Sequence, residues 1–136
     1  MDDCIFCKIV NKEMPASVIF ENTKVLAFLD IYPVNKGHVL IIPKKHYETI
    51  LEIPDELLGD VIKASKKVSK AVMKTMKADG FNVGMNNYKA SGQLVPHAHF
   101  HIIPRYENDG LKPWPQGSYQ EGEMKLVAES IKKNIA

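Results

Sequence analysis

Three of the five histidines of this chain alternate with apolar residues in the stretch VPHAHFHIIPR, residues 95–105. Successive side chains of a β-strand point to opposite faces of its sheet. The alternation therefore predicts a strand over residues 97–103 that turns His97, His99 and His101 to one face and apolar side chains to the other. One face then packs into the protein, while the other presents groups that titrate near neutral pH. Such a face is suited to a metal ion or to an anionic substrate.

The remaining apolar segments predict further strands and helices. Apolar runs bounded by turn residues indicate strands at 17–22, 24–31, 37–43 and 81–87. A long helix is expected between Pro54 and the Asp79-Gly80 pair, with acidic residues in its first turn and lysines in its last. Shorter helices are expected over 4–13 and about 123–133, and the segment 106–122 is expected to be irregular. The fold class is therefore α+β, an antiparallel sheet with one long covering helix and short terminal helices, in a single domain of residues 1–136.

Two helices are expected to turn an apolar stripe toward a core. In the last helix these residues are Met124, Val127 and Ile131. The stripe of the long helix comprises Leu57, Leu58, Val61, Ile62, Val68, Val72 and Met76.

Composition argues against several classes of partner. The formal net charge is only +2, which by itself predicts neither a nucleic-acid nor a membrane partner. No apolar run approaches the ~20 residues that a transmembrane helix needs, and the acidic N-terminus MDDCIFCKIV lacks the form of a secretory signal. We therefore expect a cytoplasmic protein whose two cysteines, Cys4 and Cys7, are reduced thiols.

The two cysteines form a C-x-x-C pair that has two interpretations. Its thiolates could complete a zinc site together with two imidazoles, and His46 is a candidate for one of these. A redox pair is the alternative for the two cysteines, and a solvated surface histidine is the alternative for His46. Because no thioredoxin-like strand precedes the pair, we favour zinc.

The residues around the triad suggest a site for a phosphate group. The loop ASGQLVP brings a glycine and Gln93 up to the histidine strand, which is typical of a phosphate cradle because backbone N–H groups and the amide can donate to an anion. Asp30, after the run VLAFLD, either caps a turn or accepts hydrogen bonds from a ribose diol. The triad itself has three interpretations: half-buried structural histidines, a metal site, or nucleophilic catalysis in which one imidazole attacks and its neighbours handle protons.

Four segments of the chain, taken in order, resemble the histidine triad family. They are CIFCKIVNKEMPA, VLAFLDIYPVNKGHVLIIPKKH, GQLVPHAHFHIIPR with the signature His-φ-His-φ-His-φ-φ (φ apolar), and WPQG. The intact triad and WPQG are similar to the Hint-type nucleoside phosphoramidate hydrolases, and the N-terminal Cys-x-x-Cys is similar to that of microbial zinc-binding members.

The resemblance implies a fold and a function. It implies a homodimeric hydrolase or transferase, its sheet continuous across the interface, that attacks the α-phosphorus of purine nucleotide conjugates without a catalytic metal. Adenosine phosphoramidates and aminoacyl adenylates are the substrates favoured by WPQG. The alternatives are a dinucleoside polyphosphate hydrolase and a regulatory purine-nucleotide-binding protein with weak catalysis.

The resemblance also implies catalytic roles. His99 would be the nucleophile that becomes nucleotidylated, and His101 would contact the phosphate. His97 and His38 would support proton handling around His99, and Gln93 would belong to the phosphate loop. Two positions depart from the family: Leu94 stands where Ser or Thr is common, and Pro96 removes a backbone donor directly before the triad.

Binding residues follow from the same resemblance. Asn86 would lie near the scissile group, and Asp30 would hold the ribose hydroxyls. The purine pocket would be formed by Ile5, Phe6, Ile9, Phe28 and Ile31. A structural zinc ion would be held by Cys4, Cys7, His46 and His97, so that His97 would not also be a free acid.

Overall fold

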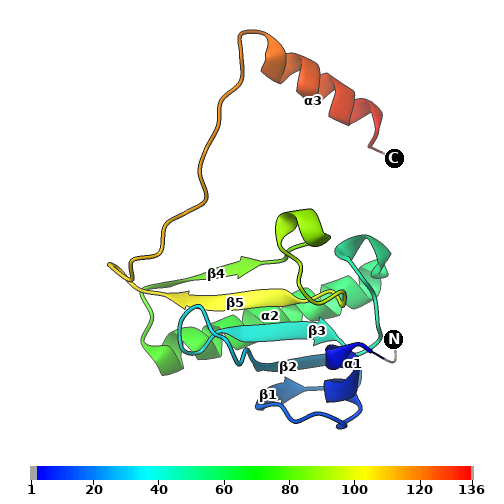
Figure 1. The fold of residues 1–136 in the computed structure, drawn as a ribbon, viewed down its shortest axis with the longest axis vertical. Helices are drawn as coiled ribbons and strands as arrows, with labels where there is room; N and C mark the ends of the chain where they lie inside the picture. The colour runs from blue at the N-terminus through cyan, green and yellow to red at the C-terminus, as the bar shows by residue number, and fades with distance from the viewer. Residues whose placement is uncertain (1–2, 136) are drawn as a thin grey trace.

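The computed structural model describes residues 3–135, and within them five strands form one antiparallel sheet in the order β1-β2-β3-β5-β4 (Figure 1). The strands are β1 (Val18–Glu21), β2 (Val25–Leu29), β3 (Val39–Pro43), β4 (Gly80–Gly84) and β5 (Phe100–Arg105). The helices are α1 (Ile5–Val10), α2 (Asp55–Met76) and α3 (Glu123–Lys133), with single 3₁₀ turns at η1 (Ile50–Glu52) and η2 (Lys89–Ser91). The predicted α+β fold is confirmed.

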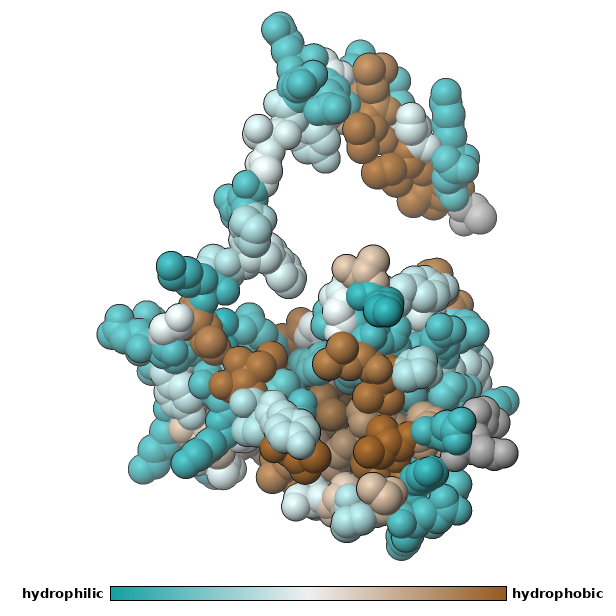
Figure 2. Space-filling view, viewed as in Figure 1, coloured by the Kyte–Doolittle hydropathy of each residue, from teal (hydrophilic) through white to brown (hydrophobic). Residues whose placement is uncertain are grey.

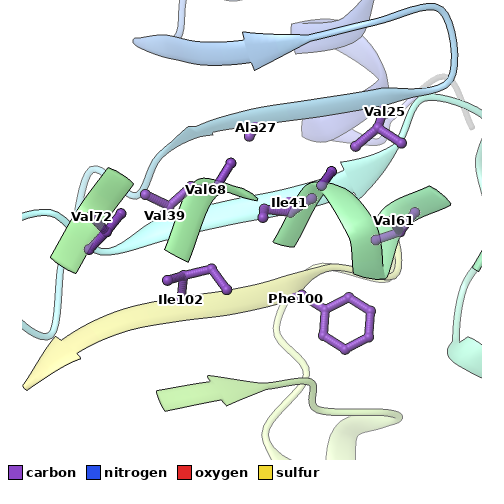
Figure 3. Packing of buried hydrophobic residues seen from close by; sticks show 10 residues of the cluster. Val25, Ala27, Val39, Ile41, Val61, Val68, Val72, Phe100 and Ile102 are labelled. Carbon is purple, nitrogen blue, oxygen red and sulfur yellow. The ribbon is translucent and has the colours of Figure 1, made fainter. Parts of the chain in front are cut away.

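The main core lies between α2 and one face of the sheet (Figure 3). The central strands β2 and β3 are buried on both faces, so their residues alternate between two apolar clusters. In β2, for example, Val25 and Ala27 pack toward α2, while Leu26 and Phe28 pack on the opposite face. The buried residues of the α2 side are Val25, Ala27, Val39, Ile41, Val61, Ala64, Val68, Val72, Phe100 and Ile102.

Helix α2 has the predicted position with two differences. It ends at Met76 instead of reaching Asp79, because Lys77 adopts a left-handed conformation with φ 51° and its N–H caps the carbonyl of Met73. Ile62, expected in the core stripe, is 45% exposed. Ser65 and Ser69, together with Ala64, take the buried positions instead, because small residues let the helix lie close to the sheet.

The second apolar cluster lies on the other face of the sheet, beneath α1. Phe6 of this helix packs with Leu26, Phe28, Leu40 and Ile42 of the central strands. The helix begins at Cys4, whose Sγ accepts a hydrogen bond from the N–H of Cys7 at 3.4 Å. This packing holds the C-x-x-C pair at the end of the sheet where the histidines gather.

Strand β5 begins at Phe100, three residues later than predicted. The N–H of Ala98, between His97 and His99, donates to the carbonyl of Tyr47 at 2.7 Å. The backbone there is therefore bonded to the segment after β3 and not to a neighbouring strand. The alternation of side chains nevertheless continues through this segment, because Phe100 and Ile102 pack against α2 while His97 and His99 contact Phe6 on the other face.

The C-terminal arm, residues 112–135, extends away from the rest of the chain (Figure 1). The residues just before it are still bonded to the body, since the Tyr106 hydroxyl donates to the carbonyl of Met76 and Asp109 accepts from Arg105. The segment 106–122 is irregular and α3 has the predicted bounds. The expectation that Met124, Val127 and Ile131 point into a core was wrong: among residues 3–135, no side chain of α3 is buried. No helix of this described part is long and apolar enough to cross a membrane.

Candidate active site

All five histidines lie in one region of the structure, at the ends of β3 and β5. His38 is the last residue before β3, and His97 and His99 lie in the loop that enters β5. His97, His38 and His99 are only 0%, 3% and 6% exposed. Neighbouring rings are in contact, with centroids 4.8 Å apart for His99 and His101 and 4.9 Å apart for His46 and His97.

The backbone determines which nitrogen of His99 carries the proton. Its Nδ1 lies 2.7 Å from the carbonyl oxygen of His97, and a carbonyl can only accept, so Nδ1–H donates this hydrogen bond. In the neutral imidazole the lone pair is then on Nε2. Phe6 contacts the ring edge-to-face, with centroids 5.1 Å apart and planes at 89°. His99 is therefore held in one orientation with a nucleophilic nitrogen left over.

A second series of hydrogen bonds determines which ring nitrogen carries the proton in His38 and in His101. The N–H of Val34 donates to His38 Nδ1 at 3.1 Å, so the proton of a neutral His38 is on Nε2. That Nε2–H lies 2.9 Å from His101 Nδ1 and 3.7 Å from a carboxylate oxygen of Asp30. His101 Nδ1 thus accepts, and the proton of a neutral His101 is on Nε2. His101 is left with a hydrogen-bond donor to offer to a ligand.

Burial keeps these imidazoles neutral at pH 7. It lowers the pKa of His97 and that of His101 to about 4, with the neighbouring histidines adding to the effect at both. Burial also lowers the pKa of His38 and of His99, and in both cases Asp30 partly opposes it. The lone pair on His99 Nε2 is therefore available over a wider pH range than in a solvated histidine.

These shifts predict that acid destabilises the metal-free protein. Between pH 6.5 and about 4 the unfolded chain binds protons that His97 and His101 in the folded chain do not. The free energy of unfolding should therefore fall as the pH is lowered through this window, by on the order of 3 kcal/mol for each histidine. Urea unfolding at a series of pH values measures the slope. The variant His101→Gln should show a shallower slope, and an equal slope would contradict this origin.

A second group of side chains has the geometry of a metal site. Cys4, Cys7, His46 and His97 offer ligand atoms that all lie within 4.8 Å of one another. His97 Nδ1 is 3.4 Å from Cys4 Sγ and 3.6 Å from Cys7 Sγ, and His46 Nδ1 is 3.3 Å from Cys7 Sγ. A tetrahedral ion with bonds of about 2.3 Å to sulfur and about 2.1 Å to nitrogen separates such atoms by about 3.6 Å. The donor set therefore fits zinc.

The proton on His97 also suits metal binding. Its Nε2 lies 2.8 Å from the carbonyl oxygen of Pro43, so Nε2–H donates there and the Nδ1 lone pair faces the two thiols. Burial and the neighbouring Cys4 raise the pKa of the Cys7 thiol to about 11, so that metal binding must displace a proton from it. His97 connects the two groups, because its ring belongs to the metal site while its carbonyl orients His99.

Asp30, His38 and His101 also lie close enough together to hold an ion. The hydrogen-bond directions argue against it, because the Nε2 of His38 that faces this group carries the proton. Asp30 Oδ1 accepts from the N–H of Tyr32 at 2.8 Å, and Oδ2 is the atom near His38. The group is better described as a proton network with one carboxylate.

The loop before the triad is held by its own hydrogen bonds. Gln93 accepts from the N–H of Tyr88 at 2.6 Å and donates to the carbonyls of Glu48 and Val95 at 2.7 and 3.1 Å. Gly92 has φ 99°, which favours glycine, and its N–H bonds within the turn. In this structure the amide of Gln93 ties the loop to the segment after β3, and both of its N–H groups are already engaged.

The residues expected around a purine are in two environments. Phe6 and Phe28 are buried in the α1 cluster with their rings in edge-to-face contact, and Ile9 packs against them. Ile5 and Ile31 are 41% and 79% exposed. Asn86 is half-buried and lies beside Gly92. A Cβ added to Gly92 would stand 3.4 Å from the side-chain amide nitrogen of Asn86.

Three backbone groups that orient the imidazoles were not anticipated from the sequence. They are the N–H of Val34 and the carbonyls of Pro43 and His97. Backbone groups leave no signature in a sequence, although Pro43 could have been suspected because it ends a strand next to the histidine segment.

Buried neutral imidazoles on an antiparallel sheet, next to a cysteine–histidine cluster that could hold a metal ion, define a candidate histidine-based catalytic site, and comparison with known proteins gives the family. Residues 11–108 match the HIT domain, which is most of the chain. The chain belongs to the HIT domain family.

Relatives cover most of the chain. An uncharacterized HIT-like protein of Methanocaldococcus jannaschii is 57% identical over 79% of this chain and 82% of its own length. The adenosine 5′-monophosphoramidase of Schizosaccharomyces pombe is 42% identical over 97% of this chain and 98% of its own.

Solved structures of the same family have the same fold. A crystal structure of a HIT family member from Bacillus subtilis is 39% identical and superposes over 98% of each chain with a TM-score of 0.91. A zinc-bound histidine triad protein of Mycobacterium smegmatis is 32% identical, covers 97% of this chain and 95% of its own, and has a TM-score of 0.78.

Proposed function

We propose that this chain hydrolyses or transfers purine nucleotide conjugates of the adenosine phosphoramidate or aminoacyl-adenylate type, through a covalent nucleotidyl intermediate on His99. The observation that carries the proposal is the orientation of His99, whose Nδ1–H bonds to the carbonyl of His97 and whose Nε2 lone pair is left for attack. The name of the fission-yeast relative, an adenosine 5′-monophosphoramidase, supports the substrate class.

In the first step His99 Nε2 attacks the α-phosphorus. A P–N bond to the imidazole forms while the bond from phosphorus to the leaving amine breaks. His101 Nε2–H donates to a phosphoryl oxygen and stabilises the charge that develops there. His38 and Asp30 hold His101 in the protonation state in which Nε2 is a donor. In the second step water attacks phosphorus and loses a proton to solvent while the P–N bond to His99 Nε2 breaks, which releases AMP and restores the neutral imidazole.

The leaving amine must gain a proton as the bond breaks. Leu94, next to Gln93, is 91% exposed and has no hydroxyl to supply it. The proton for the leaving group therefore comes from solvent in this chain, and amines that leave readily without an enzymatic acid are the better substrates.

The nucleoside is recognised next to α1. Asp30 accepts hydrogen bonds from the ribose hydroxyls with the carboxylate oxygen nearest His38. Phe6, Phe28 and Ile9 form the apolar floor under the base, with the more exposed Ile5 and Ile31 at its rim. Asn86 and Gln93 support the loop beside the scissile group.

Zinc held by Cys4, Cys7, His46 and His97 has a structural role in this proposal. Four protein ligands leave no open position for a substrate, and the ion would keep thiols and imidazoles together beneath the site. The reduced thiols that this requires are consistent with a cytoplasmic protein. We propose neither a nucleic-acid nor a membrane partner.

The chain acts as a homodimer that pairs through β4. This strand lies at an edge of the sheet, where Phe81 and Val83 are 43% and 46% exposed. Together with Ile62 of α2 they line a cavity of about 610 Å³. Ser69 also lines it, and its buried hydroxyl has no hydrogen-bond partner among the described residues. A second copy at this edge would extend the sheet and cover the cavity.

Hydrolysis of a substrate panel tests the proposal. Zinc-loaded enzyme should release AMP from adenosine 5′-phosphoramidate at least about tenfold faster, in kcat/KM, than from a dinucleoside tetraphosphate. Weak chelation that leaves the bound zinc in place should not change this rate. Faster cleavage of the dinucleotide would favour a polyphosphate hydrolase. Saturable AMP binding with no turnover would favour the regulatory binding protein.

A further inference from the structure

The β2–β3 loop, residues 30–38, determines where His38 carries its proton. The N–H of Val34 in this loop donates to His38 Nδ1 at 3.1 Å, which keeps the proton of the neutral ring on Nε2. His38 Nε2–H in turn donates to His101 Nδ1 at 2.9 Å. The donor that His101 offers from its own Nε2 therefore depends on where one backbone N–H of this loop lies.

Packing restrains the β2–β3 loop only at its end, where Gly37 lies against Met76 of α2. Earlier in the loop, Tyr32 and Val34 are 84% and 48% exposed. A loop with so few buried side chains moves unless hydrogen bonds hold it. Among the described residues, Asn35 makes the hydrogen bonds that join this exposed part to another segment of the chain.

Asn35 fixes the loop to the end of β5, which lies beside it (Figure 1). Its Nδ2 donates to the carbonyl of Pro104 at 2.8 Å and to Asp109 Oδ2 at 3.2 Å. A carbonyl can only accept, so the orientation of the amide is determined. The backbone carbonyl of Asn35 also accepts from the N–H of His38 at 3.0 Å. Since Val34 is the preceding residue, these bonds hold its N–H at the imidazole.

Asp109 is itself held in place from several directions. Arg105 donates to both carboxylate oxygens, from Nε to Oδ2 at 2.8 Å and from Nη2 to Oδ1 at 3.0 Å. The backbone N–H groups of Tyr106 and Leu111 donate to the same carboxylate at 3.1 Å each. The side chain is only 8% exposed. Beyond Leu111 the C-terminal arm stands clear of the body (Figure 2), so the hydrogen bonds of Asp109 are what fix this point of the chain.

The position of these residues gives them a part in the chemistry. A neutral imidazole has two possible sites for its proton, and the hydrogen bond made by the other nitrogen decides between them. If the proton of His38 moved to Nδ1, its Nε2 could only accept, and His101 would have to donate from Nδ1. His101 Nε2 would then turn a lone pair, and not a donor, toward a phosphoryl oxygen.

We infer that Asn35 and Asp109 are positioning residues of the reaction. They keep the N–H of Val34 on His38 Nδ1 and thereby keep a proton on His101 Nε2. The inference rests on the part that His101 has in the proposed function, as donor to a phosphoryl oxygen.

Nitrogen NMR of the imidazole rings tests the inference without substrate. In the zinc-loaded full chain with ¹⁵N-labelled histidine at neutral pH, His38 and His101 should each carry the proton on Nε2. In Asn35→Ala both rings should become mixtures of the two tautomers, with their Nδ1 signals shifted toward the protonated position. Asn35→Asp has the same size but no amide donor, so it should give the same shift. Zinc content and melting curves check that the variants are folded.

Turnover gives the second readout. In Asn35→Ala, kcat for adenosine 5′-phosphoramidate should fall roughly tenfold while KM stays within about threefold of the parent. Complete loss of a donor to the developing charge costs about 10²–10³-fold, and here only part of the molecules loses it. Asn82→Ala is the matched control, because Asn82 Oδ1 accepts from Arg105 at 2.8 Å without a hydrogen bond to the β2–β3 loop. It should keep the tautomers and the kcat of the parent.

The outcomes separate this inference from the proposed function. Parent tautomers in Asn35→Ala and Asn35→Asp would overturn the inference even if kcat fell, since the side chain would then be merely structural. Changed tautomers with the kcat of the parent would overturn it as well, as would a parent chain whose His38 carries its proton on Nδ1. A parent chain without turnover would overturn the proposed function, while the spectra would still decide whether Asn35 sets the proton of His38.

Discussion

Replacing His99 with alanine should lower kcat for adenosine 5′-phosphoramidate by roughly 10⁴-fold or more. No other imidazole in the site presents a free lone pair in the same position, because His38 and His101 are engaged with each other and His97 faces the two thiols. The loss of the ring also removes the surface that Phe6 contacts. Steady-state release of AMP measures the effect.

The variant His99→Asn separates binding from chemistry. The asparagine amide can donate to the carbonyl of His97 as the imidazole Nδ1–H does, so the loop and the nucleotide pocket should persist. AMP affinity measured by calorimetry should stay within about threefold of the parent while turnover is lost. Equal loss of affinity and turnover would mean that His99 mainly binds the nucleotide.

Cys4→Ser should release the metal and destabilise the fold. Cys4 is buried, caps α1 and lies 3.4 Å from His97 Nδ1, so a weaker ligand there breaks the connection between α1 and the histidine loop. Metal binding and folding are coupled, and a loss of about 3 kcal/mol lowers the melting temperature by roughly 10 °C in a chain of this size. Elemental analysis and thermal melts measure the two effects.

The matched control is Lys8→Ser, which changes the same helix outside the ligand set. It should retain the metal and melt close to the parent. A strong chelator should lower the melting temperature of the parent to that of Cys4→Ser and leave the variant itself unchanged. Full zinc content in Cys4→Ser would contradict the ligand set.

The histidine face could be predicted from the sequence because alternation is a local property. Side chains from His97 to Ile102 do alternate between two faces, although β5 begins only at Phe100. The strand starts late because the N–H of Ala98 finds its acceptor at Tyr47, a residue distant in the sequence. The protonation of His97 could not be predicted for the same reason, since the carbonyl of Pro43 decides it. The groups that decide His38 and His99, the N–H of Val34 and the carbonyl of His97, are near in sequence, but a sequence does not show where a backbone group points.

For the α3 helix the sequence predicted the local structure but not the packing. Its apolar period predicted the bounds of the helix correctly, because period and end signals are local. The same period suggested that Met124 and Ile131 point into a core, yet both are more than half exposed. A sequence pattern shows that a face must be covered, but it does not say whether the covering surface belongs to the same chain.

Intact-mass spectrometry after a rapid quench in alkaline denaturant, in which a P–N bond to imidazole is stable, tests the central claim most directly. Zinc-loaded enzyme mixed with adenosine 5′-phosphoramidate should gain the mass of one AMP moiety per chain, and His99→Ala should gain none. Turnover by the parent chain with no adduct at any quench time, or an adduct that persists in His99→Ala, would contradict a covalent intermediate on His99.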